Sequence, residues 1–76
     1  MEKELVEYIA QNLVNNPSEV LVRSRRTGSS TILELRVGQG DMGRVIGKQG
    51  RVANAMRALL QVIATRKDTR IMLDID

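Results

Sequence analysis

Two glycines, Gly47 and Gly50, flank the dipeptide Lys48-Gln49 just before the longest helical pattern in the chain. Because glycine has no Cβ atom, both positions accept a positive φ and let another backbone approach closely. A helix that begins near Gly50 directs unpaired N–H groups and the positive end of its dipole toward the dipeptide. The pattern therefore predicts an anion-accepting loop, while a plain turn between two helices remains the alternative.

The hydrophobic pattern on both sides of this loop predicts an α+β fold. Apolar residues at helical spacing alternate with segments in which every second residue is apolar. The elements expected in chain order are helix Glu4–Asn15, strands Val20–Arg26 and Thr31–Val37, short helix Met42–Ile46, long helix Arg51–Arg66 and strand Arg70–Ile75.

Each expected strand has one apolar face, so the helices should cover one side of a three-stranded mixed sheet. On the first strand this face comprises Val20, Val22 and Ser24. Asp41 is expected to cap the short helix, which Gly47 ends. With 76 residues the chain can form only one small core, so we expect a single domain over residues 1–76.

The residue inventory argues against most enzyme chemistry. The sequence has no cysteine and no histidine, which excludes disulfides and the usual zinc sites. Its acids lie mostly at the two ends, so no general acid–base pair or activated nucleophile can be named. We therefore expect a protein that is not an enzyme, with no catalytic residues, no metal and no cofactor.

The charge distribution favours a polyanionic partner. Between Leu21 and Arg70 there are eleven cations and three acids, whereas the two ends together hold six acids and one cation. No apolar run approaches the length of a membrane span, and the acidic start Met1-Glu2-Lys3-Glu4 does not resemble a targeting peptide. These features predict no membrane association, and the absence of cysteine fits a cytoplasmic location.

Two phosphate-binding motifs match the sequence only superficially. The segment Gly38–Gly43 has the glycine spacing of a dinucleotide fingerprint, but the helix that it would open ends within about one turn at Gly47. The segment Gly43–Lys48 is one residue short of a P-loop, and Gln49 stands where Ser or Thr must bind magnesium. We reject both interpretations.

With the element order in place, the chain resembles a type II KH domain, α-β-β-α-α-β, whose Gly-x-x-Gly loop clamps about four nucleotides of a single strand. The run Asp41–Arg51, followed by Ala55-Met56-Arg57, is similar to the small bacterial single-domain KH proteins of the KhpA family. The resemblance covers essentially the whole chain.

The resemblance implies which residues contact RNA. Gly47, Lys48, Gln49 and Gly50 would contact the phosphodiester backbone, and Arg44 and Arg51 would flank them. Val45 and Ile46 fit the aliphatic floor of the base groove, although each is equally suited to the core. Because the only aromatic residue is Tyr8, bases would rest on aliphatic side chains, with hydrogen bonds from Gln49 or Asn54. Arg25 and Arg26 are further candidates to extend the track.

The resemblance also implies partners. Family members are described as cytoplasmic RNA chaperones linked to cell elongation and division, and thus to cell shape and cell-wall biogenesis. They form homodimers and pair with a larger KH protein of the Jag type. The apolar arc of Arg51–Arg66 spans about 200°, about twice what one core requires. Val52, Ala55, Leu59 and Val62 are therefore expected at a dimer interface, and the alternative is that the first helix covers the whole arc within one chain. The alternative is a KH-fold interaction module without nucleic-acid binding.

Overall fold

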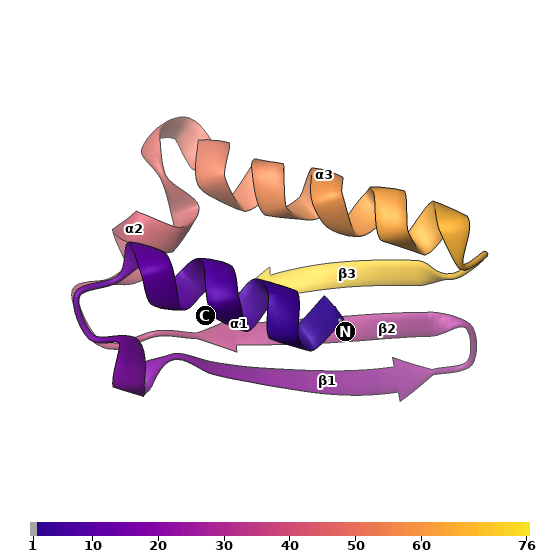
Figure 1. Ribbon diagram of the computed structural model, residues 1–76, viewed down its shortest axis with the longest axis horizontal. Helices are drawn as coiled ribbons and strands as arrows, with labels where there is room; N and C mark the ends of the chain where they lie inside the picture. The colour runs from indigo at the N-terminus through magenta and orange to yellow at the C-terminus, as the bar shows by residue number, and fades with distance from the viewer. Residues whose placement is uncertain (1) are drawn as a thin grey trace.

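Three helices, three strands and two 3₁₀ turns make up residues 2–76 in a computed structural model of the protein, shown in Figure 1. The elements are α1 (Glu2–Leu13), a turn at Pro17–Glu19, β1 (Leu21–Thr27), β2 (Ser30–Arg36), α2 (Met42–Ile46), a turn at Lys48–Gly50, α3 (Arg51–Arg66) and β3 (Arg70–Ile75).

The strands form one mixed sheet in the order β1-β2-β3. β1 pairs antiparallel with β2, from Leu21 opposite Arg36 to Thr27 opposite Ser30. β2 pairs parallel with β3, from Ser30 opposite Arg70 to Leu35 opposite Ile75. The parallel pairing requires a crossover, which α2, the Gly-x-x-Gly loop and α3 supply. β1 and β3 are therefore the two edge strands.

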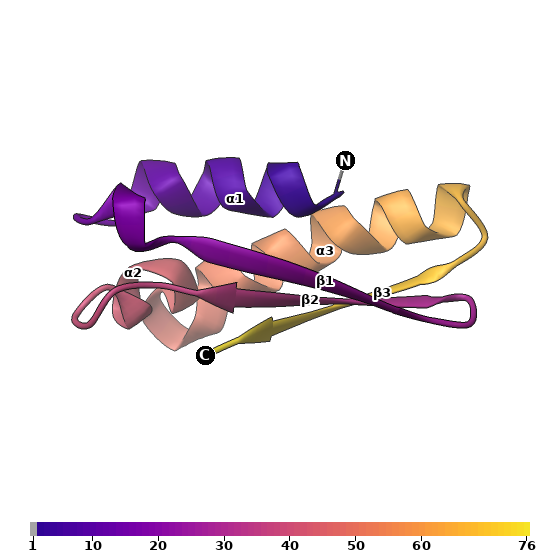
Figure 2. The same cartoon turned by 90° about the horizontal axis from the view of Figure 1, so that it is seen from below.

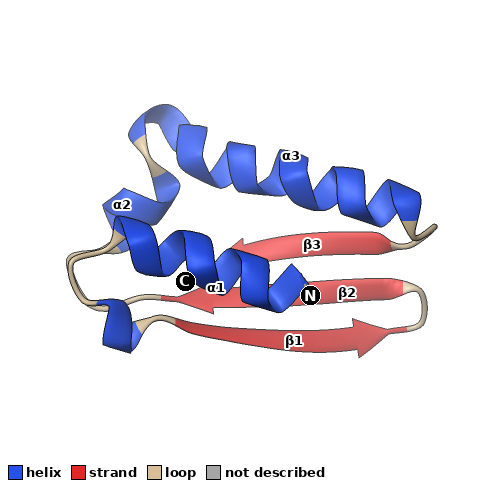
Figure 3. Cartoon of the chain, viewed as in Figure 1, coloured by secondary structure: helices blue, strands red, loops and turns tan. Residues whose placement is uncertain are grey.

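α1 and α3 pack on one face of this sheet, and the other face has no helix over it (Figures 2 and 3). The alternation of apolar residues on the strands, with the apolar stripes of the helices, places one core between the two layers. The α+β architecture predicted from the sequence is confirmed. The buried core residues are Val6, Ala10, Val22, Leu33, Leu35, Val45, Met56, Leu60, Ala64, Ile71 and Leu73.

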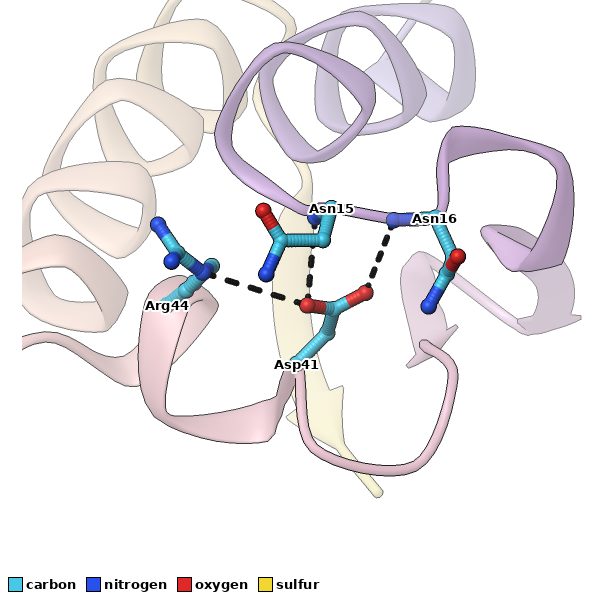
Figure 4. A network of polar contacts seen from close by, with 4 residues as sticks. All are labelled: Asn15, Asn16, Asp41 and Arg44. Carbon is cyan, nitrogen blue, oxygen red and sulfur yellow. Dashed lines mark hydrogen bonds and ion pairs between the residues drawn. The ribbon is translucent and has the colours of Figure 1, made fainter.

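The first helix ends two residues earlier than predicted, at Leu13, and a buried carboxylate gives the reason. Asp41 is 1% exposed and accepts hydrogen bonds from the backbone amides of Asn15 (3.1 Å) and Asn16 (3.0 Å), as Figure 4 shows. The prediction that Asp41 caps α2 was right in position and wrong in bonding. Its side chain makes no capping hydrogen bond to α2 and instead anchors the segment that follows α1.

The inward face predicted for β1 was also partly wrong. Val22 is 2% exposed, but Ser24 is exposed. β1 is an edge strand, and of the residues from Leu21 to Thr27 only Val22 is buried. A serine on such a strand stays in water at little cost, because its hydroxyl needs no protein partner there.

The molecule is elongated, with extents of 35, 22 and 17 Å. The loop between α2 and α3 lies at one end of the long axis, and the β1–β2 and α3–β3 turns lie at the other (Figure 1). Within residues 2–76 no helix is long and apolar enough to cross a membrane.

Candidate nucleic-acid interface

The loop that follows α2 begins at a position where only glycine fits. Gly47 has φ 77° and ψ 171°, and its amide donates to Gly43 O at 2.8 Å. A Cβ atom at Gly47 would lie 2.6 Å from Val52 Cγ2 and 2.8 Å from the Val52 amide nitrogen. Since the second atom is backbone, it cannot move aside, and this close approach sets the path of the loop across the start of α3.

The loop continues with two successive residues in the left-handed region. Gln49 has φ 57° and ψ 25°, and Gly50 has φ 76° and ψ 14°. The hydrogen bonds of the turn are donated by Gly50, to Gly47 O at 3.1 Å, and by Arg51, to Lys48 O. Among the described residues, the amides of Lys48 and Gln49 have no backbone partner, and both residues are exposed. Such an unpaired amide pair next to a helix start is a docking point for an anion.

The cations predicted to flank the loop occupy two different settings. Lys48 and Arg51 are exposed, and within residues 2–76 neither makes an ion pair. Arg44 is also exposed, but its Nε lies 3.9 Å from Asp41 Oδ1, at the edge of ion-pair range (Figure 4). The carboxylate that fixes the end of α1 therefore also restrains Arg44 beside the loop.

The two aliphatic candidates beside the loop differ in how deeply they are buried. Val45 is 0% exposed and belongs to the core, which is one of the two roles that the sequence left open for it, so its side chain is not available to a ligand. Ile46 is half-buried and retains an accessible surface. Asn54 is exposed one turn into α3, and its Nδ2 lies 3.6 Å from where a Cβ on Gly50 would be.

Sequence reasoning did not select Arg57 for the site. Its Nη2 donates to Leu73 O at 3.1 Å, which joins α3 to the free edge of β3. Between the two elements lies a trough of about 320 Å³ lined by Arg57, Gln61, Ile71, Met72, Leu73 and Asp74. The available signal was the spacing of Asn54, Arg57 and Gln61, which places all three on one side of a helix.

The outer surface of α3 has the exposed apolar residues that the sequence predicted. Leu59 is 50% and Val62 54% exposed, and Ala55 is exposed beside them. Val52 is less exposed than these three, because one side of it packs against Gly47. These four residues are called the α3 patch below. Within residues 2–76 no group of three or more His, Cys, Asp or Glu residues is placed to hold a metal ion.

Comparison with known proteins identifies the family of this fold. The family profile described as "KhpA/KhpB, KH domain" matches residues 3–75. The chain belongs to the KhpA/KhpB family of KH domains. Its match covers nearly the whole chain, which includes the loop and both helices that hold it. The family resemblance predicted from the sequence is therefore confirmed.

Curated KhpA proteins are similar to the chain over almost their full length. The RNA-binding protein KhpA of Halalkalibacterium halodurans is 48% identical over 73 residues, which covers 96% of each chain. That of Treponema pallidum is 48% identical over 75 residues, covering 99% of this chain and 94% of its own. That of Borreliella burgdorferi is 45% identical over 74 residues, covering 97% and 90%.

Proposed function

We propose that the chain binds single-stranded RNA through the Gly-x-x-Gly loop. The observation that carries the proposal is the pair of unpaired amides at Lys48 and Gln49, in a turn whose backbone is left-handed at Gln49 and Gly50 and leads into α3. The names of the KhpA relatives, which are called RNA-binding proteins, support the same function.

The contacts follow from the geometry of the loop. Because Gly47 and Gly50 have no side chains to cover the backbone, a phosphate can reach the amides of Lys48 and Gln49. Lys48, Arg44 and Arg51 add positive charge around that phosphate. Ile46 and Asn54, on either side of the loop, offer an aliphatic surface and a hydrogen-bonding amide to a base.

Fluorescence anisotropy of a labelled RNA across a salt series tests this role. Three phosphate contacts predict a log–log salt slope of roughly −2, or about a twentyfold loss between roughly 50 and 200 mM salt. The double variant Lys48→Asp with Gln49→Asp should abolish binding at every salt concentration. Unchanged affinity and slope would remove the loop from the mechanism.

A matched control separates the loop from net charge. Arg23→Asp with Ser24→Asp changes the formal charge by the same three units, at exposed positions of β1. If the loop binds RNA, the control retains most of the affinity. An equal loss in both double variants would mean that only overall charge attracts the RNA.

We further propose that the α3 patch joins two chains, either as a homodimer or with a larger KH protein of the Jag type. Its support is the exposure of Leu59 and Val62 on a helix whose opposite side already fills the core. A dimer presents two loops, which raises avidity without new contacts. Sedimentation of the wild-type chain and of Leu59→Asp checks the homodimer, which the variant should disrupt. A wild-type chain that is monomeric at working concentration would exclude a homodimer through the patch.

The cellular role that we propose is that of a cytoplasmic RNA chaperone acting on cell shape and cell-wall biogenesis, as the family resemblance implies. The second candidate is an interaction module that keeps the KH fold and binds no nucleic acid. The exposed α3 patch favours it as much as it favours a dimeric RNA-binding protein. Absence of RNA binding in an intact, self-associating chain would select this second function.

A further inference from the structure

The free edge of β1 is open to solvent. Figure 1 shows this strand at one margin of the molecule, and no element of residues 2–76 lies beyond it. β1 pairs with β2 at seven consecutive positions, without a bulge, and it contains no proline. Bulges and prolines are common means of blunting an edge strand, so in β1 only the charged side chains serve that purpose.

The hydrogen bonds of β2 show which backbone groups of β1 face outward. Ser29 O, directly before β2, accepts from Arg70 N, and Leu35 O accepts from Asp76 N. The odd-numbered positions of β2 therefore bond toward β3, and the even-numbered positions bond toward β1. Since these stand opposite the odd-numbered residues of β1, the even-numbered residues of β1 direct their N–H and C=O groups to solvent. The N–H groups concerned, called the outer amides below, belong to Val22, Ser24 and Arg26.

Cations dominate the side chains along this edge. β1 contains three arginines and no acid. Arg25 already binds a carboxylate, since its Nη2 lies 3.2 Å from Glu34 Oε2. Arg23 and Arg26 are exposed and, within the described part of the chain, make no ion pair. They project to opposite faces of the sheet, so a strand that pairs with β1 meets a free guanidinium on each face.

A second copy of the chain fits this edge poorly. If two β1 strands paired antiparallel about Ser24, Arg23 of each copy would stand opposite Arg25 of the other, and like charges so placed are destabilising. The other edge strand, β3, has its Leu73 O already occupied by Arg57. The occupant is therefore a different chain, and the free guanidinium groups select one that carries carboxylates.

A nucleic-acid strand also matches this edge less well than a peptide does. Phosphate oxygens accept hydrogen bonds and donate none, so they leave the outward C=O groups of β1 unpaired, whereas an extended peptide pairs with both kinds of group. Arg25 and Arg26, which the sequence suggested as an extension of the RNA track, lie close to the β1–β2 turn. That turn is at the end of the molecule opposite the Gly-x-x-Gly loop (Figure 1).

We propose that the free edge of β1 binds an acidic, extended segment of a partner protein, which adds a fourth strand to the sheet. The backbone of the segment pairs with the outward groups of β1, and its carboxylates bind Arg23 and Arg26. A segment of about seven residues spans the strand at about 3.4 Å per residue. The proposal goes beyond RNA binding and does not depend on it, because β1 belongs neither to the loop nor to the α3 patch.

Amide hydrogen exchange with a designed peptide tests the pairing. The acidic probe is an eight-residue peptide of valine and threonine with blocked ends and two glutamates three positions apart, which matches the spacing of Arg23 and Arg26. At about ten times its Kd, the probe should slow exchange of the outer amides about tenfold. The amides of Arg23 and Arg25 already face β2 and should change little. Slowing of neither set, or equal slowing of both, would overturn the proposal.

A second peptide separates backbone pairing from charge. The acidic probe with N-methyl groups on all its uncharged residues keeps its two charges but cannot pair with a strand. It should bind at least about tenfold more weakly, because main-chain hydrogen bonds supply most of the affinity of an added strand. Equal affinities of the two peptides would mean that charge alone attracts them and would contradict strand addition.

Paired charge variants test the two arginines. Arg23→Gln with Arg26→Gln should weaken binding of the acidic probe about fivefold, as expected for two exposed ion pairs. The control, Arg66→Gln with Arg70→Gln, removes the same two charges from exposed positions outside β1 and should have little effect. Equal losses would exclude a local site. A labelled RNA that slows the outer amides, or slowing that grows with protein concentration alone, would give the edge to RNA or to a second copy and overturn the proposal.

Proline at position 24 blocks the edge from the protein side. The N–H of Ser24 faces solvent, so Ser24→Pro removes no bond of the sheet, and edge strands tolerate proline at such positions. Its circular dichroism should match that of the wild type, while its affinity for the acidic probe falls at least about tenfold. Ser24→Ala keeps the N–H and should bind like the wild type. Undiminished binding by a folded Ser24→Pro chain would rule out pairing at this edge.

Discussion

The carboxylate of Asp41 holds the backbone amide of Asn16 at 3.0 Å, across 25 positions of the chain. It holds the amide of Asn15 at 3.1 Å with its other oxygen. Asp41→Ala would leave two partly buried donors without a partner and should lower the free energy of unfolding by about 2–4 kcal/mol. Urea denaturation followed by circular dichroism measures this change.

Asparagine at position 41 supplies the control for that experiment. Its amide keeps one acceptor oxygen, so Asp41→Asn should lose only part of the stability that Asp41→Ala loses. Equal midpoints for the wild type and Asp41→Ala would show that the link between α1 and α2 contributes nothing.

The contact between Gly47 and Val52 predicts opposite effects for two glycine substitutions. Gly47→Ala places a Cβ 2.8 Å from a backbone nitrogen at φ 77°, so it should cost about 1–3 kcal/mol and weaken RNA binding. Gly43→Ala meets no atom within 4 Å and lies inside α2, so it should stabilise by up to about 1 kcal/mol. Thermal unfolding and anisotropy measure both effects.

Gly43→Ala is thus the internal control for Gly47→Ala, because both add one methyl group within five residues. If Gly47→Ala retained both stability and affinity, the close approach to Val52 would not determine the shape of the loop.

Val45 and Ile46 should respond differently to the same substitution. Val45→Thr buries a hydroxyl in the core and should cost about 1–3 kcal/mol of stability. Ile46→Thr changes a half-buried surface and should cost less stability but more RNA affinity. Denaturation measures the loss of stability and anisotropy the loss of RNA affinity in both variants. If Val45→Thr lost more affinity and less stability than Ile46→Thr, Val45 would lie in the ligand site.

The pair formed by Glu2 and Lys67 makes stability depend on pH. The hydrogen bond from Lys67 lowers the pKa of Glu2 from its ordinary value of 4.5. A carboxyl whose pKa is lower in the folded chain stabilises above its unfolded value, and that stability is lost as the pH falls through the folded value. Because the pair is at the surface, Glu2→Gln should cost about 0.2–1 kcal/mol at pH 7.

At a pH well below 4.5 the wild type and Glu2→Gln should be equally stable, since Glu2 is then protonated in both folded and unfolded wild-type chains. Chemical denaturation at several pH values measures the difference in the free energy of unfolding between the wild type and Glu2→Gln. A constant difference across this range would mean that the ion pair is not its source.

The sequence predicted α2, α3 and β3 with the bounds that the structure has. These elements begin or end at residues with strong local preferences, such as Gly47, and α3 has a long, regular apolar pattern. The errors involved contacts between distant residues. The end of α1 depends on Asp41. The sequence left the role of Val45 open, and its burial depends on how α2 packs against α1 and α3. The spacing of apolar residues along the sequence reveals neither the contact that Asp41 makes nor the burial of Val45.

The bond from Arg57 also protects the rim of the sheet. The free edge of β3 offers unpaired N–H and C=O groups, which invite another extended chain to pair with them. Because the Arg57 guanidinium already occupies Leu73 O, another extended chain that paired with β3 would have to displace this charged donor. The bond should therefore make edge-to-edge association through β3 less favourable where many copies of the chain gather.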